Sequence, residues 1–216
     1  MFRNELYLSG RKKDVIALLN EIISDDELTF YKIMPVPPEM DGFMCTQPNQ
    51  KDILLVKKER NNECLTPEEK EHLDSETRDD ITTMEDVMLD APKISVRDLC
   101  LKSIKRYEKT GAYTWADWCL IHWGTRKPVY RSNLEILINT EVLTTVRIEF
   151  DTCDFLPSRF LLCLAKLHPD VSIKAVYDVG GDEEQTFTLP QDTEKLKEMH
   201  KKALNLANNF NNKKSG

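Results

Sequence analysis

The sequence predicts an α+β protein that is built around an antiparallel sheet. Three observations indicate this class: segments with the two-residue period of strands, segments with the period of helices, and prolines and glycines that separate them. Of the 216 residues, 40% are hydrophobic and 31% are charged, which is typical of a folded globular protein.

The N-terminal region predicts a strand, a helix and a second strand. The segment 4–9 alternates leucines with other residues and ends at Gly10, which is a turn signal. Apolar residues recur at helical spacing over 12–23, so this segment predicts an amphipathic helix. The segment 28–36 returns to β character, and the prolines at its end stop it because proline cannot donate to a sheet ladder.

The middle of the chain, 39–110, predicts a mainly helical and acidic insertion that lies over the sheet. Two Thr-x-x-Glu boxes and one serine cap mark the starts of helices within it. These signals are Thr66 with Glu69, Thr82 with Glu85, and Ser95, whose helix ends just before Gly111.

Sheet character resumes after the insertion. The segments 118–123, 134–138 and 142–150 predict strands, and the last of them alternates apolar and polar residues without interruption. An apolar helix over 159–168 follows a capping Ser158. Two more strands, 171–179 and 186–189, and a C-terminal helix over 193–209 complete the predicted elements.

Without the insertion, these elements follow the βαββαβ order of a ferredoxin-like fold. We therefore expect a single ferredoxin-like domain over 1–210, with 39–110 as its helical insertion and with a C-terminal helix. The polar tail 211–216 is expected to be disordered.

Composition excludes several function classes. No apolar run reaches the length of about 18 residues that a membrane span needs, and the N-terminus lacks the pattern of a secretory signal, so we expect a cytoplasmic protein without a membrane partner. The six cysteines are scattered without a CxxC pair, which favours reduced thiols over a zinc site. The net charge of −7 disfavours nucleic acid as a partner. The alternative is a nucleic-acid-binding protein that uses the sheet face and the basic helix segment 102–109.

Three separated blocks carry a resemblance to a known family. They are NELYLSG at 4–10 leading to IMPVP at 33–37, WCLIHWGTR at 118–126, and IEFDT at 148–152 followed by Pro157 and the apolar helix. In order and spacing they resemble the YubB ferredoxin-like family of phage and plasmid proteins. The sequence departs from the family pattern at Arg126, where the family has lysine, at Lys127, where it has tryptophan, and at Cys153-Asp154, where it has Ala-Trp. The resemblance implies a fold and a mobile-element setting, and it implies no reaction.

The densest aromatic block is the first candidate for a ligand or partner surface. A strand that ends in Trp-Gly-Thr-Arg can offer aromatic rings for stacking and a cation for an anionic ligand. The alternative is that the tryptophans fill the core and the glycine permits a turn. The residues of this candidate surface are Trp118, Trp123, Gly124, Thr125 and Arg126.

No catalytic residue, metal site or cofactor is predicted. Cys119 and His122 are three residues apart, and on a strand they would point to opposite faces and share no ion. A nucleophile pair of Cys153 and His168 has no local signature to support it. The phosphate-binding, serine-nucleophile, zinc-protease and dinucleotide-binding motifs are absent from the sequence.

The acidic part of the insertion is the second candidate surface. A compact acidic surface can occupy the basic nucleic-acid groove of another protein through electrostatic complementarity. The alternative is an ordinary solvated surface. The residues proposed for this acidic surface are Glu68, Glu69, Asp79, Asp80, Glu85 and Asp86.

Together these features favour a non-enzymatic accessory protein of a phage or other mobile element in the cytoplasm of a bacterial host. It is expected to bind a macromolecular partner, a protein rather than a nucleic acid, and inhibition of a host system is one version of this hypothesis. The alternative is an enzyme or a small-ligand-binding domain that uses a groove near Trp123–Arg126. The sequence predicts neither the partner's identity nor the oligomeric state.

Overall fold

The computed structural model describes residues 1–40, 48–78, 93–178 and 184–213. The chain forms two compact units. The sheet unit comprises Met1–Pro35 and Cys119–Leu206, and the helical unit comprises Val36–Trp118 and Ala207–Gly216. The predicted insertion 39–110 lies within the helical unit.

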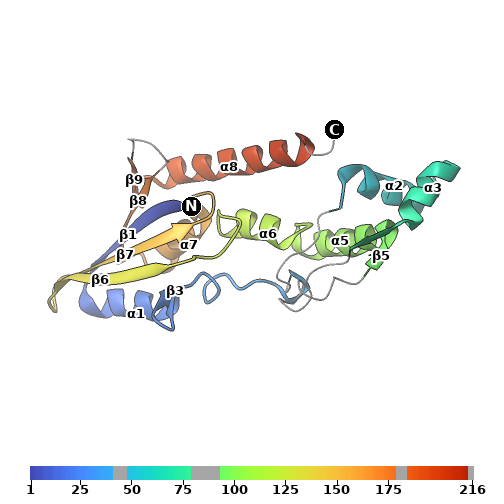
Figure 1. Ribbon diagram of the computed structural model, residues 1–216. Helices are drawn as coiled ribbons and strands as arrows, with labels where there is room; N and C mark the ends of the chain where they lie inside the picture. Colours follow the sequence, from blue (N-terminus) through green and yellow to red (C-terminus); the bar gives the residue numbers. More distant parts are fainter. Residues whose placement is uncertain (41–47, 79–92, 179–183, 214–216) are drawn as a thin grey trace. The chain divides into compact units, whose positions relative to one another are not determined.

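The sheet unit contains a five-stranded sheet in the order β6-β7-β1-β8-β9, in which every neighbouring pair is antiparallel (Figure 1). This confirms the predicted α+β class with an antiparallel sheet. The strands are β1 (Phe2–Gly10), β6 (Ser132–Asn139), β7 (Thr144–Thr152), β8 (Ser172–Asp178) and β9 (Glu184–Leu189).

One face of this sheet forms the apolar core. In β7 the buried residues alternate strictly with half-buried ones, which confirms the alternation seen in the sequence. Leu6 of β1 lies opposite Ile148 of β7, and both side chains are completely buried. The helices α1 (Lys12–Ile22) and α7 (Ser158–Leu167) bury their own apolar stripes, so they supply the layer that covers this face.

The predicted strand over 28–36 is wrong. Only β2 (Ile23–Ser24) and β3 (Glu27–Leu28) are extended here, and they form a two-residue hairpin. The chain then turns, because Met34 and Ile33 donate their backbone N–H groups to the Phe30 carbonyl. Phe30 is fully buried and lies 4.4 Å, ring centre to ring centre, from Phe160. The Phe30 side chain therefore packs into the core from a turn, and the β propensity of phenylalanine does not decide the backbone conformation here.

The predicted strand over 118–123 is also wrong, because residues 118–122 belong to the helix α6 (Trp115–His122) and Trp123 lies in the turn that follows it. Helical hydrogen bonds run from the Trp118 N–H to the Thr114 carbonyl and from the Trp123 N–H to the Cys119 carbonyl. Cys119 and Leu120 are both buried, so adjacent residues of this short run face apolar surroundings. A short continuous apolar run has no period that distinguishes a buried strand from a buried helix.

The helical unit packs three helices around a small core (Figure 1). They are α2 (Gln50–Arg60), α3 (Pro67–Asp74) and α5 (Val96–Thr110), accompanied by the short strands β4 (Glu76–Arg78) and β5 (Lys93–Ser95) and the 3-10 turn η1 (Pro38–Met40). The core consists of Ile53, Val56, Leu65, Leu73, Val96, Cys100 and Ile104.

The start signals of two helices are confirmed. Thr66 and Glu69 form a reciprocal capping box at the start of α3. The Ser95 side chain accepts the Asp98 N–H at the start of α5, and Gly111 adopts the left-handed conformation just after its end. The predicted box at Thr82 and Glu85 lies outside the described residues.

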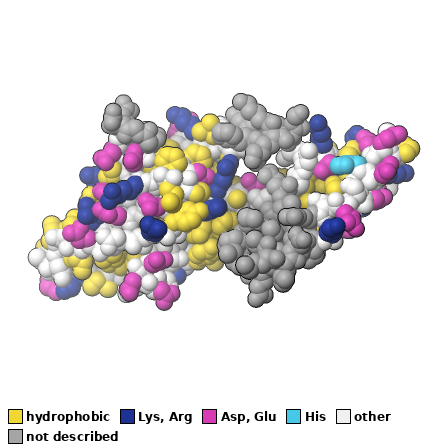
Figure 2. Space-filling view, viewed as in Figure 1, with side chains coloured by type: hydrophobic (Ala, Val, Ile, Leu, Met, Phe, Trp, Pro, Cys, Tyr) yellow, Lys and Arg dark blue, Asp and Glu magenta, His cyan; other side chains and the backbone are white. Residues whose placement is uncertain are grey.

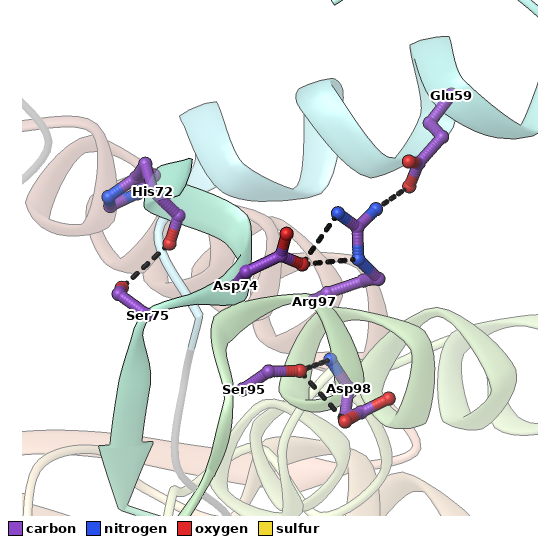
Figure 3. A network of polar contacts seen from close by, with 7 residues as sticks. All are labelled: Glu59, His72, Asp74, Ser75, Ser95, Arg97 and Asp98. Atoms are coloured by element: carbon purple, nitrogen blue, oxygen red, sulfur yellow. Dashed lines mark hydrogen bonds and ion pairs between the residues drawn. The ribbon is translucent and has the colours of Figure 1, made fainter. Parts of the chain in front are cut away.

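Arg97 connects all three helices of this unit (Figure 3). Its guanidinium donates to Asp74 Oδ1 of α3 at 2.8 and 3.2 Å and to Glu59 of α2. Charge-assisted bonds in a fork of this kind fix direction as well as distance. The guanidinium therefore fixes the position of α3 on α5.

The C-terminal helix α8 runs from Thr193 to Lys213. It extends further than predicted, so residues 211–213 of the predicted tail are helical, and the rest of that tail, 214–216, lies outside the described residues. Among the residues that the structure describes, no helix combines the length and the apolarity that crossing a membrane would require.

Candidate functional site

Trp123 lies inside the sheet unit and not on its surface. Its side chain is fully buried, and its indole Nε1 donates to the Met34 carbonyl at 3.0 Å. The rings of Phe30 and Tyr31 meet it edge-on at 5.4 and 5.1 Å between centres. Trp118, the other tryptophan of the candidate surface, is only 5% exposed. Neither ring is therefore available for stacking on a ligand.

Gly124 ends α6 and allows α7 to approach closely. Its φ of +95° is a conformation that favours glycine, and its N–H bonds back to the Leu120 carbonyl. A Cβ at this position would lie 2.7 Å from the backbone nitrogen of Ser158. The Phe160 N–H also donates to the Trp123 carbonyl at 3.2 Å. Gly124 thus permits the contact between the end of α6 and the start of α7.

Thr125 and Arg126 are held by Asp154. The Thr125 hydroxyl donates to Asp154 Oδ1 at 2.8 Å, and the Arg126 backbone N–H donates to the same oxygen at 3.2 Å. The Arg126 side chain lies 3.7 Å from Asp154 Oδ2. The Phe155 N–H also binds Oδ1, at 3.0 Å. This arrangement binds two loops of the sheet unit to each other.

Sequence reasoning treated Asp154 only as a departure from a family pattern and missed its role. The available signal was a single carboxylate that stands in the otherwise apolar or uncharged segment 152–157. Such an acid is expected to be hydrogen-bonded when it is removed from water. The Trp-Gly-Thr-Arg block therefore uses its polar groups inside the protein.

Cys153 is placed as an inert thiol. Its Sγ donates to Asp154 Oδ1 at 3.0 Å, and burial followed by the hydrogen bond to Asp154 raises the pKa of the thiol to about 11. Because the thiolate is the nucleophile, this environment suppresses nucleophilic chemistry at neutral pH. His168 does not pair with it, since its Nε2 lies 3.1 Å from Glu21 Oε2.

Cys119 and His122 lie on α6, so the strand argument applied to them above does not hold. Residues three apart on a helix share a side, yet Cys119 is completely buried. Burial and the nearby Arg159 charge lower the pKa of His122. Within the described ranges, no group of three or more histidine, cysteine, aspartate or glutamate side chains is arranged to hold a metal ion.

The acidic candidate surface is described only in part. Glu68 is exposed on α3, and hydrogen bonds from its own backbone N–H and from Thr66 lower the pKa of its carboxyl. Glu69 is turned back into the capping box, where its Oε2 accepts the Thr66 N–H at 2.8 Å. Asp79, Asp80, Glu85 and Asp86 lie outside the described residues. Glu71, which was not singled out from the sequence, is exposed on the same helix.

Several cations of the helical unit are engaged in intramolecular ion pairs. Arg60 lies 3.0 Å from Glu108, Lys109 lies 3.0 Å from Glu39, and Arg97 binds Glu59 and Asp74. Glu68 and Glu71 of α3, in contrast, form no ion pair with any described residue. Lys70 lies on the same helix and offsets part of their charge.

Large apolar side chains are exposed on the β6–β7 hairpin of the sheet unit. Figure 2 shows hydrophobic atoms among charged ones on the visible face of this unit. Each of the residues concerned exposes more than a third of its surface. They are Leu134, Ile136, Leu137 and Ile138 of β6, and Val142 and Leu143 of the turn that follows.

A shallow depression of about 450 Å³ lies at the other end of the sheet's polar face. Two arginines and two carboxylates line it, and Arg3 binds Glu149 across it at 3.0 Å. Its charges therefore balance internally. The lining residues are Arg3, Arg131, Ser132, Asn133, Glu149, Phe150 and Asp151.

Comparison of the chain with protein-family models, with curated proteins and with solved structures found no match. The geometry of the chain's own residues therefore has to carry any conclusion about function.

Proposed function

We propose that this chain is a non-enzymatic accessory protein of a phage or other mobile element. It acts in the cytoplasm of a bacterial host by binding a protein partner through an acidic surface of the helical unit. Inhibition of a host nucleic-acid-binding system is the effect proposed for this interaction.

The strand order supports the ferredoxin-like topology that this proposal includes. Four strands follow the order β6-β7-β1-β8, with α1 after β1 and α7 between β7 and β8. This is the arrangement expected of a βαββαβ unit if β6, rather than the segment 28–36, is its second strand. The same order is compatible with the proposed kinship to the YubB family.

The observation that carries the function is that three cations of the helical unit are bound to the unit's own acids, while two exposed carboxylates of α3 have no ion pair among the described residues. Arg60, Arg97 and Lys109 are bound to acids of the unit itself. Glu68 and Glu71 project from α3 without an ion pair to any described residue. The charge that α3 offers to a partner is therefore negative, which fits a basic protein surface.

The position of α3 adds to this support. Leu73 is completely buried in the core of the unit, the capping box fixes the first turn, and Arg97 binds Asp74 in the last turn. Carboxylates on a helix that is fixed at three points lose little further freedom when a partner binds. The surface is thus preorganised for association.

The Trp-Gly-Thr-Arg block gives the alternative, a ligand-binding or enzymatic domain, less support. Trp123 and Thr125 are fully buried, and Asp154 already occupies the Thr125 hydroxyl and the Arg126 N–H. Of Trp123, Thr125 and Arg126, only Arg126 reaches the surface, with 35% of its side chain exposed.

Charge reversal on α3 tests the proposal. The tagged chain is used to retain partners from a bacterial lysate, and the retained protein is identified, purified and titrated against the wild type and against the double variant Glu68→Lys, Glu71→Lys. We expect the variant to weaken binding at low salt by at least roughly tenfold, about 1.4 kcal/mol. Raising the salt concentration should reduce the difference, because exposed charges are screened.

The matched control is the double variant Glu194→Lys, Glu198→Lys, which makes the same change in net charge on exposed positions of α8. It should bind the partner with the wild-type affinity. Equal weakening by both double variants would mean that net charge alone acts, and unchanged binding by the α3 variant would exclude this surface.

A further inference from the structure

The strand β6 is an edge strand with the composition of an interior strand. It ends the order β6-β7-β1-β8-β9, so its outer side pairs with no other described strand. It contains no lysine and no proline, two residues that commonly protect edges from pairing. Its single ionisable side chain, Glu135, is bound by Arg147 of the same sheet at 2.7 Å.

The opposite edge of the same sheet has a different pattern. In β9 the apolar Phe187 and Leu189 are buried, while Glu184, Gln185 and Thr186 are exposed. That is the alternation of a strand with one side on the core and one side in water. In β6, Leu134, Ile136 and Ile138 are 36%, 56% and 42% exposed. The two edges therefore differ in whether the described residues cover their apolar side chains.

The backbone of β6 is regular only in its first part. Ser132 to Ile136 pair with β7 residue by residue, and the register shifts between Ile136 and Ile138. The shift is a bulge, which accommodates Leu137 and turns Ile138 to the face opposite that of Ile136. A straight segment of about five residues, 132–136, therefore remains on the outer edge, and at its first residue the Ser132 hydroxyl oxygen accepts the Leu28 N–H of β3 at 2.7 Å.

We propose that this segment pairs with the same segment of a second copy of the chain, antiparallel about a two-fold axis at Leu134. Such pairing sets Leu134 opposite Leu134 of the second copy and Asn133 opposite Glu135 of the second copy. The amide of Asn133 can donate to the carboxylate it faces, and no two like charges meet. The two-fold axis generates this complementary pair two times, once on each side of Leu134, as an isologous interface requires.

The paired segment covers only part of the exposed apolar surface. Its two apolar residues, Leu134 and Ile136, leave on the order of 150 Å² per chain at the observed exposures. This is below the area of a standard interface, so the backbone hydrogen bonds of the paired edges supply much of the affinity and the dimer is weak. This inference concerns the sheet unit, and it is independent of the function proposed for α3.

The experiment is analytical ultracentrifugation of the full-length chain over a range of concentrations up to about 100 µM, where a dimer of micromolar affinity is well populated. We expect the wild type to approach twice the monomer mass and Ile136→Lys to remain monomeric. The matched control, Thr186→Lys, places the same charge on an exposed position of the other edge and should dimerise like the wild type.

A wild type that stays monomeric throughout, or an Ile136→Lys variant that dimerises like the wild type, overturns the proposal. If circular dichroism shows that Ile136→Lys has not folded, hydrogen exchange of the wild type decides. The amides of 132–136 should exchange at least several-fold more slowly at high than at low concentration, and rates independent of concentration also overturn the proposal.

Discussion

Two apolar segments of the chain differ in burial: the block 118–123 is largely buried, and the segment 134–138 is exposed. The sequence of the block that ends in Trp123 predicts a strand, but its residues before Trp123 belong to the helix α6. Trp123 itself is buried, and its indole N–H is hydrogen-bonded inside the protein. The segment 134–138 reads as a strand, forms one, and keeps its apolar side chains at the surface. Apolar character thus fails to predict burial when none of the described residues forms a layer over the segment.

The difference has an energetic consequence. Burial of a large side chain contributes to stability in proportion to the surface it removes from water, and an exposed side chain contributes little. The stability of the sheet unit should therefore depend on the block around Trp123, and β6 should be tolerant of change unless another molecule covers it.

The largest effect is expected for Trp123→Ala. This variant removes a completely buried ring that contacts Phe30 and Tyr31 and leaves the Met34 carbonyl without its indole donor. We expect the free energy of unfolding to fall by about 3–5 kcal/mol, measured by denaturant titration of the full chain. Ile136→Thr, at a position that is 56% exposed, should change it by no more than about 0.5 kcal/mol. Comparable losses in the free energy of unfolding for the two variants would contradict the difference between the buried block around Trp123 and the exposed strand β6.

The next effect concerns His200 of α8, which is 9% exposed and has a buried Nδ1 without a hydrogen-bond partner among the described residues. Burial, then the charges of Arg159 and His122, lower the pKa of His200 to about 4, although a hydrogen bond to the Ile121 backbone opposes this. Between this pH and the ordinary value of 6.5, the folded protein binds fewer protons than the unfolded chain.

The free energy of unfolding should therefore decrease as the pH falls from about 6.5 to about 4, by up to about 3 kcal/mol from this group, and the contribution should be constant below that range. Denaturant titrations at several pH values test this. The variant His200→Gln, which cannot become charged, should remove this part of the pH dependence. The same slope in both proteins would show that His200 does not cause it.

A smaller effect is expected for Gly124→Ala. The new Cβ would lie 2.7 Å from the Ser158 backbone nitrogen at a φ of +95°, so both the close approach of α7 and the backbone conformation are disturbed. We expect a loss of about 2 kcal/mol. Gly111→Ala separates the two causes, since φ is +77° there but no atom lies within 4 Å of the new Cβ, and it should cost about 1 kcal/mol. Equal losses in thermal or denaturant unfolding would mean that contact with Ser158 is unimportant.

Local sequence patterns predicted the elements whose signals are contained in a few neighbouring residues. The alternation in β7, the capping box of Thr66 and Glu69, the Ser95 cap and the Gly111 ending are all present in the structure. Each of these depends on backbone geometry and on hydrogen bonds that span at most four residues, so the sequence contains the information directly.

The candidate sites show the limit of such patterns. The sequence identified the Trp-Gly-Thr-Arg block but not Asp154, which lies 29 residues from Thr125 along the chain and 2.8 Å from it in space. It predicted an acidic surface but not the pairing of the cations nearby, which depends on contacts between α2, α3 and α5.

By itself, the sequence determined the α+β class, the strand period of β1, β6 and β7, and the caps of α3 and α5. Only the tertiary structure decided that the residues before Trp123 form a helix, that Phe30 packs from a turn, and that β6 lies at the edge of the sheet. The physical reason is that apolar residues specify a need for burial without specifying a partner. Which surfaces meet is settled by strand pairing and helix packing between residues far apart in the chain.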